Sequence, residues 1–84
     1  MYYAYIIYSK SIDRYYVGYT GNLELRLERH NQGWSQSTKR GIPWEIKYYE
    51  VFENKSATLK REREIKSKKS RTFIEKLIAE GRPE

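Results

Sequence analysis

Two tyrosines near the N-terminus, Tyr5 and Tyr16, are the first residues whose type and spacing could serve chemistry. Each lies in a short run rich in tyrosine and aliphatic residues, which predicts a strand. Because side chains alternate across a sheet, the two share a face if the connecting loop has an even number of residues, which Ser9–Arg14 can provide. Tyrosine is also an ordinary strand former, so packing alone explains most tyrosines in such runs.

Arg26 and His30 are separated by one helical turn and therefore lie on one face of a predicted helix. Both flank an apolar stripe formed by Leu23 and Leu27. A guanidinium in this position can hold a phosphate with two hydrogen bonds, and an imidazole beside it can donate to the same group. The alternative is a solvated helix face with a hydrogen-bonded histidine.

Glu62 is the third candidate, since it projects from the apolar arc of a later helix whereas Glu64 points away. The residues of this arc are Thr58, Leu59 and Ile65. A carboxylate on the core-facing side is costly unless a cation or hydrogen-bond donors compensate it. Lys66, four residues on, could be that cation. A hard divalent metal ion is the functional alternative, because carboxylate oxygen is its preferred ligand.

The overall charge favours a polyanionic partner. Seventeen Lys and Arg against eleven Asp and Glu give a formal charge of +6 and a pI near 9.6. Residues 55–76 contain nine basic residues and three glutamates. Neutralising phosphates with such residues releases condensed counterions, although a solvated helical face has the same composition. Without cysteine, a signal-peptide pattern or an apolar run long enough for a bilayer, the sequence predicts a cytoplasmic protein.

The elements that must position these residues follow the order β-β-α-β-α-α. Strands are expected over residues 2–8, 15–20 and 44–52, with Ile46, Tyr48 and Glu50 alternating against Lys47, Tyr49 and Val51. Helices are expected from the N-cap Asn22 to about Gln32, from Asn54 or Ser56 to about Ser67, and from Ser70 until Gly81 and Pro83. The sequence thus predicts one α+β domain over residues 1–84, with a small antiparallel-rich sheet flanked by three helices.

Several spaced motifs in this order resemble those of GIY-YIG nucleases, and in particular the small stand-alone bacterial proteins of that family. Tyr3-Ala4-Tyr5 and, ten residues later, Tyr16-Val17-Gly18 resemble the GIY and YIG motifs. Arg26 and His30 follow where the family has its helical arginine and a frequent histidine. Residues 61–66 resemble the later glutamate-containing helix. The first motif departs from the pattern at Tyr3 and Ala4, and the asparagine that many members carry after the glutamate has no clear counterpart.

The resemblance implies a catalytic set of Tyr5, Tyr16, Arg26, His30 and Glu62. Glu62 would hold a single Mg²⁺ or Mn²⁺, and Arg26 would neutralise the phosphoryl oxygens in the transition state. Tyr5 would accept the proton of the attacking water and Tyr16 would position the water or the phosphate, although Tyr16 could equally be the base. Since a phenol has a pKa near 10, the base needs a nearby cation such as the metal or Lys10.

The expected function is hydrolysis of nucleic-acid phosphodiester bonds by a divalent-metal-dependent endonuclease, with DNA favoured over RNA and weak or structure-based selectivity. The alternatives are a nucleic-acid-binding module of the same fold with little or no cleavage, and a protein-interaction domain. The residues expected to contact nucleic acid are Lys10, Arg29, Lys39, Arg40, Lys60, Arg63 and Lys66.

Overall fold

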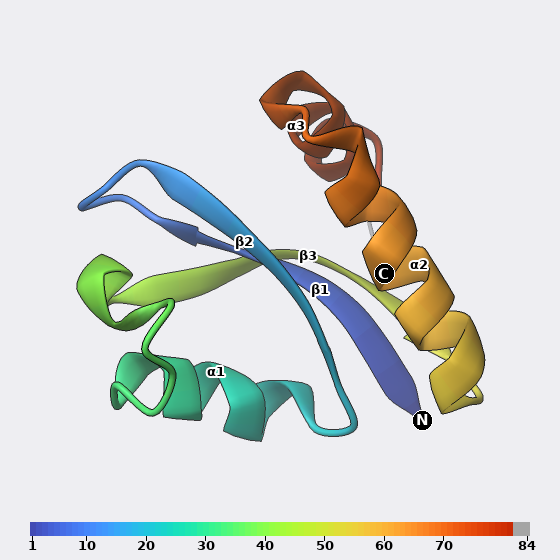
Figure 1. Cartoon of the computed structure of the whole chain (residues 1–84), viewed down its shortest axis with the longest axis horizontal. Coiled ribbons are helices and arrows are strands. Elements are labelled where there is room, and N and C mark those ends of the chain that lie inside the picture. Colours follow the sequence, from blue (N-terminus) through green and yellow to red (C-terminus); the bar gives the residue numbers. More distant parts are fainter. Residues whose placement is uncertain (82–84) are drawn as a thin grey trace.

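The computed structural model describes residues 1–81 and contains one three-stranded antiparallel sheet (Figure 1). Strand β1 (Tyr2–Ser9) lies in the centre, between β2 (Arg14–Thr20) and β3 (Trp44–Phe52). The helices are α1 (Leu23–Asn31), α2 (Lys55–Lys68) and α3 (Arg71–Glu80), with a short 3-10 turn, η1 (Lys39–Gly41), before β3. The predicted α+β class and the order β-β-α-β-α-α are confirmed.

Each helix begins at the side-chain cap that the sequence predicts. The side chains of Asn22, Asn54 and Ser70 accept hydrogen bonds from backbone N–H groups three residues later, which satisfies donors that the first turn leaves free. Of the two caps proposed for α2, the structure therefore selects Asn54. Gly33, with φ of +83°, reverses the chain after α1, and Gly81 follows α3 as its C-cap. Pro83 lies outside the described residues.

The helices cover both faces of the sheet, and each face has its own core. Figure 1 shows α1 on one side and α2 with α3 on the other. On the α1 side, Leu23 and Leu27 pack on Tyr5, Ile7 and Trp44. The core on the other side contains Ile6, Val17, Tyr48 and Ile65, covered by Phe73, Ile74, Leu77 and Ile78 of α3. Among residues 1–81, no helix is long and apolar enough to cross a membrane.

The predicted alternation along β3 fails at Ile46, because the strand contains a bulge, and holds for Tyr48 and Tyr49. Ile6 pairs with Tyr48, whereas its neighbour Ile7 pairs with Ile46, so Lys47 is an extra residue on β3. The bulge places Ile46 in the α1 core and Tyr48 in the opposite core, although their spacing of two predicts a shared face. Tyr49, expected opposite Ile46, joins it on the α1 side.

Candidate active site

The hairpin register places Tyr5 and Tyr16 on the same face of the sheet. Tyr5 pairs with Gly18 and Ile7 pairs with Tyr16, so residues 16 and 18 both lie on the side of Tyr5. The turn between the strands contains residues 10–13, which is the even number that this parity requires. Both tyrosines belong to the core beneath α1.

Gly18 leaves the space in which the Tyr5 side chain lies. A Cβ atom at position 18 would approach the Tyr5 hydroxyl to 2.6 Å and its ring carbon Cζ to 2.8 Å, both below any normal contact. The glycine of the second motif therefore has a steric reason: it lets the buried Tyr5 ring cross the neighbouring strand.

Replacing Gly18 by alanine should consequently displace the Tyr5 ring rather than unfold the chain. Overpacking of this kind costs roughly 1–3 kcal/mol of unfolding free energy. Urea denaturation should measure that loss, and the tyrosine ring signals in an NMR spectrum should shift. Gly21→Ala is the matched control, because a Cβ there has an ordinary contact of 3.8 Å. Equal losses in the two variants would contradict the steric role of Gly18.

The Tyr5 hydroxyl is the centre of a buried hydrogen-bond network. Its oxygen accepts from Nε of Arg26 at 3.2 Å and lies 2.9 Å from Nε2 of His30. His30 Nδ1 lies 2.8 Å from the hydroxyl of Thr38, which itself donates to the carbonyl of Ser35. The contact of Thr38 with Ser35 favours the tautomer in which Nδ1 of His30 donates to Thr38 and Nε2 accepts the proton of Tyr5. The network fixes Arg26 and the α1 end of the site against the sheet.

Electrostatics keep Tyr5 and His30 of this network in their neutral forms. Burial raises the pKa of Tyr5, against the opposing effect of the hydrogen bond from Arg26. Burial, assisted by the charge of Arg26, lowers the pKa of His30 to about 4, so the imidazole is neutral at neutral pH. Both shifts keep the proton on the Tyr5 hydroxyl.

Tyr16 differs from Tyr5 in being only half-buried. Its ring meets the ring of His30 edge-on, with centroids 5.2 Å apart, and that of Trp44 at 6.4 Å. The hydrogen bond to Tyr5 raises the pKa of Arg26, and the nearby Tyr16 adds to this rise. The guanidinium thus interacts with both tyrosines, and the Tyr16 side remains open to solvent.

Glu62 reaches the same site from the helix on the other side of the edge strand. Figure 1 shows β2 passing between α1 and α2. The carboxylate of Glu62 is close enough for its charge to contribute to the raised pKa of Tyr5. Lys66 pairs with Glu62 at 3.1 Å, and its Nζ lies 5.8 Å from the centroid of the Tyr16 ring. The Glu62 side chain is 15% exposed and that of Glu64 is 55% exposed, which is the orientation expected from the helical arc.

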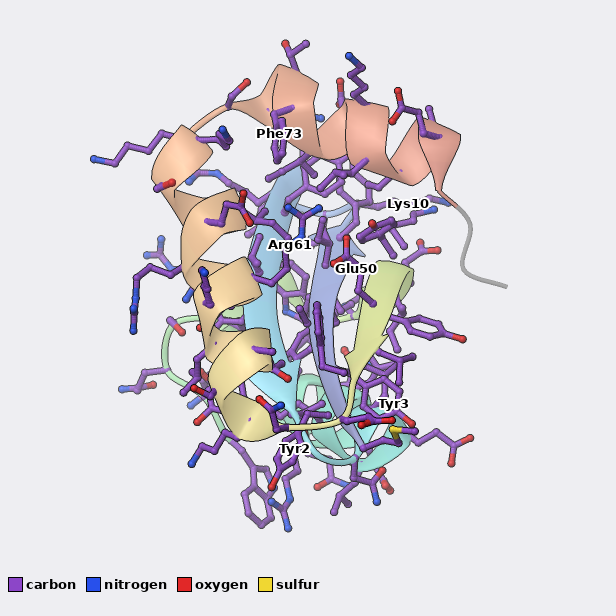
Figure 2. All side chains as sticks on the ribbon, turned by 90° about the vertical axis from the view of Figure 1, so that its right-hand side faces the viewer. Tyr2, Tyr3, Lys10, Glu50, Arg61 and Phe73 are labelled. Carbon is purple, nitrogen blue, oxygen red and sulfur yellow. The ribbon has the colours of Figure 1, made fainter. Side chains whose placement is uncertain are left out.

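An ion pair next to Glu62 fixes the position of α2. Arg61 donates from Nε and Nη2 to the two carboxylate oxygens of Glu50, both at 2.9 Å (Figure 2). Tyr48 donates to the same carboxylate. This two-point contact ties α2 to β3 and therefore limits how far the adjacent Glu62 can move.

The donor set around Glu62 suits a hard cation held by few protein ligands. Within residues 1–81 there is no group of three or more His, Cys, Asp or Glu side chains able to hold a metal ion. A cation at Glu62 would therefore retain water or phosphate oxygens as its other ligands, as Mg²⁺ does beside one or two carboxylates. The 3.1 Å pair with Lys66 shows that this carboxylate already attracts a positive charge. The residues present fit a divalent ion.

The predicted nucleic-acid contacts are distributed over more than one surface. Arg29 lies beside Arg26 on α1, whereas Lys60 and Arg63 are exposed on α2 and Lys39 and Arg40 are exposed on η1. Lys10 lies in the hairpin turn, five residues or roughly 17 Å along the strand from Tyr5. The expectation that Lys10 is the cation near the base is therefore wrong for Tyr5, because Arg26 occupies that position.

Two residues near the site, Thr38 and Trp34, are not among the site residues predicted from the sequence. Thr38 orients His30 from a loop eight residues away, and no periodic pattern marks such a contact. Trp34 is 66% exposed directly after Gly33. A large aromatic residue within a polar loop was the signal that could have identified it.

The comparisons with known proteins agree with this geometry. The sequence family described as the GIY-YIG catalytic domain matches residues 1–76 of this chain. A UPF0213 protein of Natronomonas pharaonis is 40% identical over 79 residues, which cover 93% of this chain and 91% of the relative. A UPF0213 protein of Staphylococcus saprophyticus is 42% identical over 80 residues, covering 94% and 95%. The solution NMR structure of a UPF0213 protein from Bacillus halodurans has a TM-score of 0.59 at 30% identity, covering 99% of this chain and 89% of that one. This chain therefore belongs to the GIY-YIG family of nuclease domains.

Proposed function

We propose that this chain is a divalent-metal-dependent endonuclease that hydrolyses phosphodiester bonds in nucleic acid, with Mg²⁺ or Mn²⁺ as its ion. The observation that carries the proposal is the convergence of Tyr5, Tyr16, Arg26 and Glu62 from four different elements at the β2 edge of the sheet. Binding alone does not require a carboxylate in that position, since a carboxylate repels phosphate. A divalent ion bound to the carboxylate would remove this repulsion between Glu62 and the phosphate.

The ion held by Glu62 would stabilise charge on the scissile phosphate and on the leaving oxygen. Arg26 would hold the phosphoryl oxygens with the N–H groups that it does not use toward Tyr5. Glu62 would then no longer pair with Lys66, whose side chain is half-exposed and can turn toward the phosphate backbone.

Tyr16 is the better candidate for the proton acceptor. Tyr5 is 1% exposed and its hydroxyl already accepts from Arg26 and donates to His30, so it lacks access to a water molecule. Tyr16 is half-buried and lies beside Arg26 on one side and Lys66 on the other. In this proposal Tyr5 and His30 orient Arg26, and Tyr16 takes the proton of the attacking water.

Arg26→Ala should reduce cleavage by roughly 10²–10³-fold, the usual effect of losing one preorganised donor to a developing negative charge. Arg26→Lys should recover little, because an ammonium cannot bond the Tyr5 hydroxyl and a phosphate in the same planar geometry. Single-turnover cleavage rates measure the effect. Lys47→Ala removes a surface cation paired with Glu45 and is the charge-matched control. A similar rate for Arg26→Ala and Lys47→Ala would contradict the role of Arg26.

The substrate is expected to be bound through phosphates by the Arg26 face and the exposed cations of α2. DNA is favoured over RNA as the substrate. Weak or structure-based selectivity is expected because so small a domain has little surface for reading base edges. On duplex DNA, log affinity should fall with log salt by about 0.9 for each phosphate neutralised.

Incubation with labelled branched, single-stranded and duplex DNA and RNA, with Mg²⁺ or Mn²⁺, tests the proposal. Cleavage products should form from at least one DNA substrate. Salt-dependent binding with no cleavage of any substrate would favour the alternative, a binding module of the same fold. If the chain neither binds nor cleaves any of these substrates, both the endonuclease and the binding module are excluded and a protein-interaction domain is favoured.

A further inference from the structure

A pocket beside the proposed active site contains residues that the proposed chemistry does not use. Its volume is about 130 Å³, and it is lined by Arg26, Arg29, His30, Trp34 and Ser35. Arg26 and His30 connect it to the tyrosine network. The proposed cleavage reaction gives no role to the other two large side chains of the pocket, Arg29 and Trp34.

Trp34 is exposed but held in a defined position. Its backbone N–H donates to the carbonyl of Arg29 at 3.1 Å, and the φ of +83° at Gly33 directs the chain back over the end of α1. The guanidinium carbon of Arg29 lies 4.6 Å from the centroid of the indole ring, so it covers one face. With 66% of the residue exposed and no place in either core cluster, the ring does not serve packing.

The charges in the pocket favour an anionic ligand. Arg26 and Arg29 are three residues apart on α1 and therefore project from the same side of the helix. Among the described residues, neither arginine forms an ion pair with a carboxylate, although six such pairs occur elsewhere. Two uncompensated guanidiniums next to an open indole face match a phosphate with its attached base.

We propose that Trp34 and Arg29 form a stacking site for an unpaired base next to the phosphate that Arg26 holds. A base within a duplex has both faces stacked on its neighbours and cannot reach the indole, whereas a single-stranded, flap or fork nucleotide can. The inference rests on the proposed function and narrows its substrate class to nucleic acid with an unpaired nucleotide at the cleavage site. A protein partner would instead need carboxylates to pair with the two arginines.

The test compares a short labelled oligothymidylate with an abasic strand that has the same number of phosphates. Affinities for the full chain are measured by fluorescence anisotropy in EDTA, so that no strand is cut. The strand with bases should bind roughly 5- to 150-fold more tightly, as expected for one stacked base, and should quench tryptophan fluorescence. Trp34→Ala should abolish that difference without changing affinity for the abasic strand. Trp34→Phe should keep most of it, and Val51→Ala, which trims an exposed side chain on β3, should change nothing.

Equal affinity of the wild-type chain for the two strands would overturn the proposal. A Trp34→Ala variant that still prefers the strand with bases would also overturn it. That result would show that Trp34 does not stack on a base and would favour a protein contact for this residue. These results are separable from the nuclease proposal. If Trp34→Ala still cuts duplex DNA and the preference for bases was never present, only the stacking site is refuted. If stacking is observed and no substrate is cut, only the nuclease activity is refuted.

Discussion

Replacing Glu62 by glutamine is expected to reduce cleavage by roughly 10³-fold or more, because the ion that the carboxylate would hold contributes several kcal/mol of charge stabilisation. Glutamine has nearly the same shape, so the side chain can still occupy its 15%-exposed position on α2. Nucleic-acid affinity in EDTA should be unchanged or higher, since one negative charge is removed from a basic surface. Single-turnover rates and anisotropy on the same preparation measure the two effects.

Glu64→Gln is the matched control for Glu62→Gln. Glu64 lies on the same helix, is 55% exposed and contacts Arg61 at 3.2 Å on the surface. Losing an exposed ion pair costs at most about 1 kcal/mol of stability, and this residue has no route to the site. The assignment of the metal ligand is wrong if Glu64→Gln is the inactive variant and Glu62→Gln is active.

Tyr16→Phe should reduce cleavage by roughly 10²–10⁴-fold, the range for loss of a positioned proton acceptor. Its ring contacts with His30 and Trp44 remain, so the free energy of unfolding should change little.

Tyr5→Phe should instead reduce stability more than cleavage. Removing the Tyr5 hydroxyl leaves Arg26 and His30 without their buried partner, which costs roughly 1–3 kcal/mol of stability, while cleavage falls less.

The comparison of these two variants decides between the tyrosines. Cleavage rates and urea denaturation curves are measured for both, together with Tyr19→Phe on the same strand as a control for removing a hydroxyl. If Tyr5→Phe is the less active variant and keeps full stability, then Tyr5 is the proton acceptor and the burial argument fails.

Much of this arrangement follows from local rules that a single sequence contains. The N-caps Asn22, Asn54 and Ser70 predict where the helices begin because a side-chain acceptor must lie three residues before a free N–H group. The parity of the hairpin predicts that Tyr5 and Tyr16 share a face, since only the number of turn residues matters. The one-turn spacing likewise predicts that Arg26 and His30 project together.

Other features depend on contacts between distant segments and have no local signature. The bulge at Lys47 places Ile46 and Tyr48 on opposite faces of the sheet, and no composition signal marks it. The distance of Lys10 from Tyr5 depends on where β1 ends, because a longer strand carries the turn farther from the site. The burial of Tyr5 against Gly18, which removes it from solvent and favours Tyr16 as the base, becomes visible only when the two strands are paired.

The most direct test of metal-dependent hydrolysis is chelation followed by metal add-back, with the wild-type chain and Glu62→Gln purified in parallel. A forked DNA with a labelled single-stranded arm serves as substrate. Wild-type cleavage should stop when EDTA is added and return when excess Mg²⁺ or Mn²⁺ is supplied, while Glu62→Gln stays inactive throughout. Cleavage that continues in EDTA, or that is equal in the two preparations, would contradict the proposal that Glu62 and a divalent ion perform the reaction.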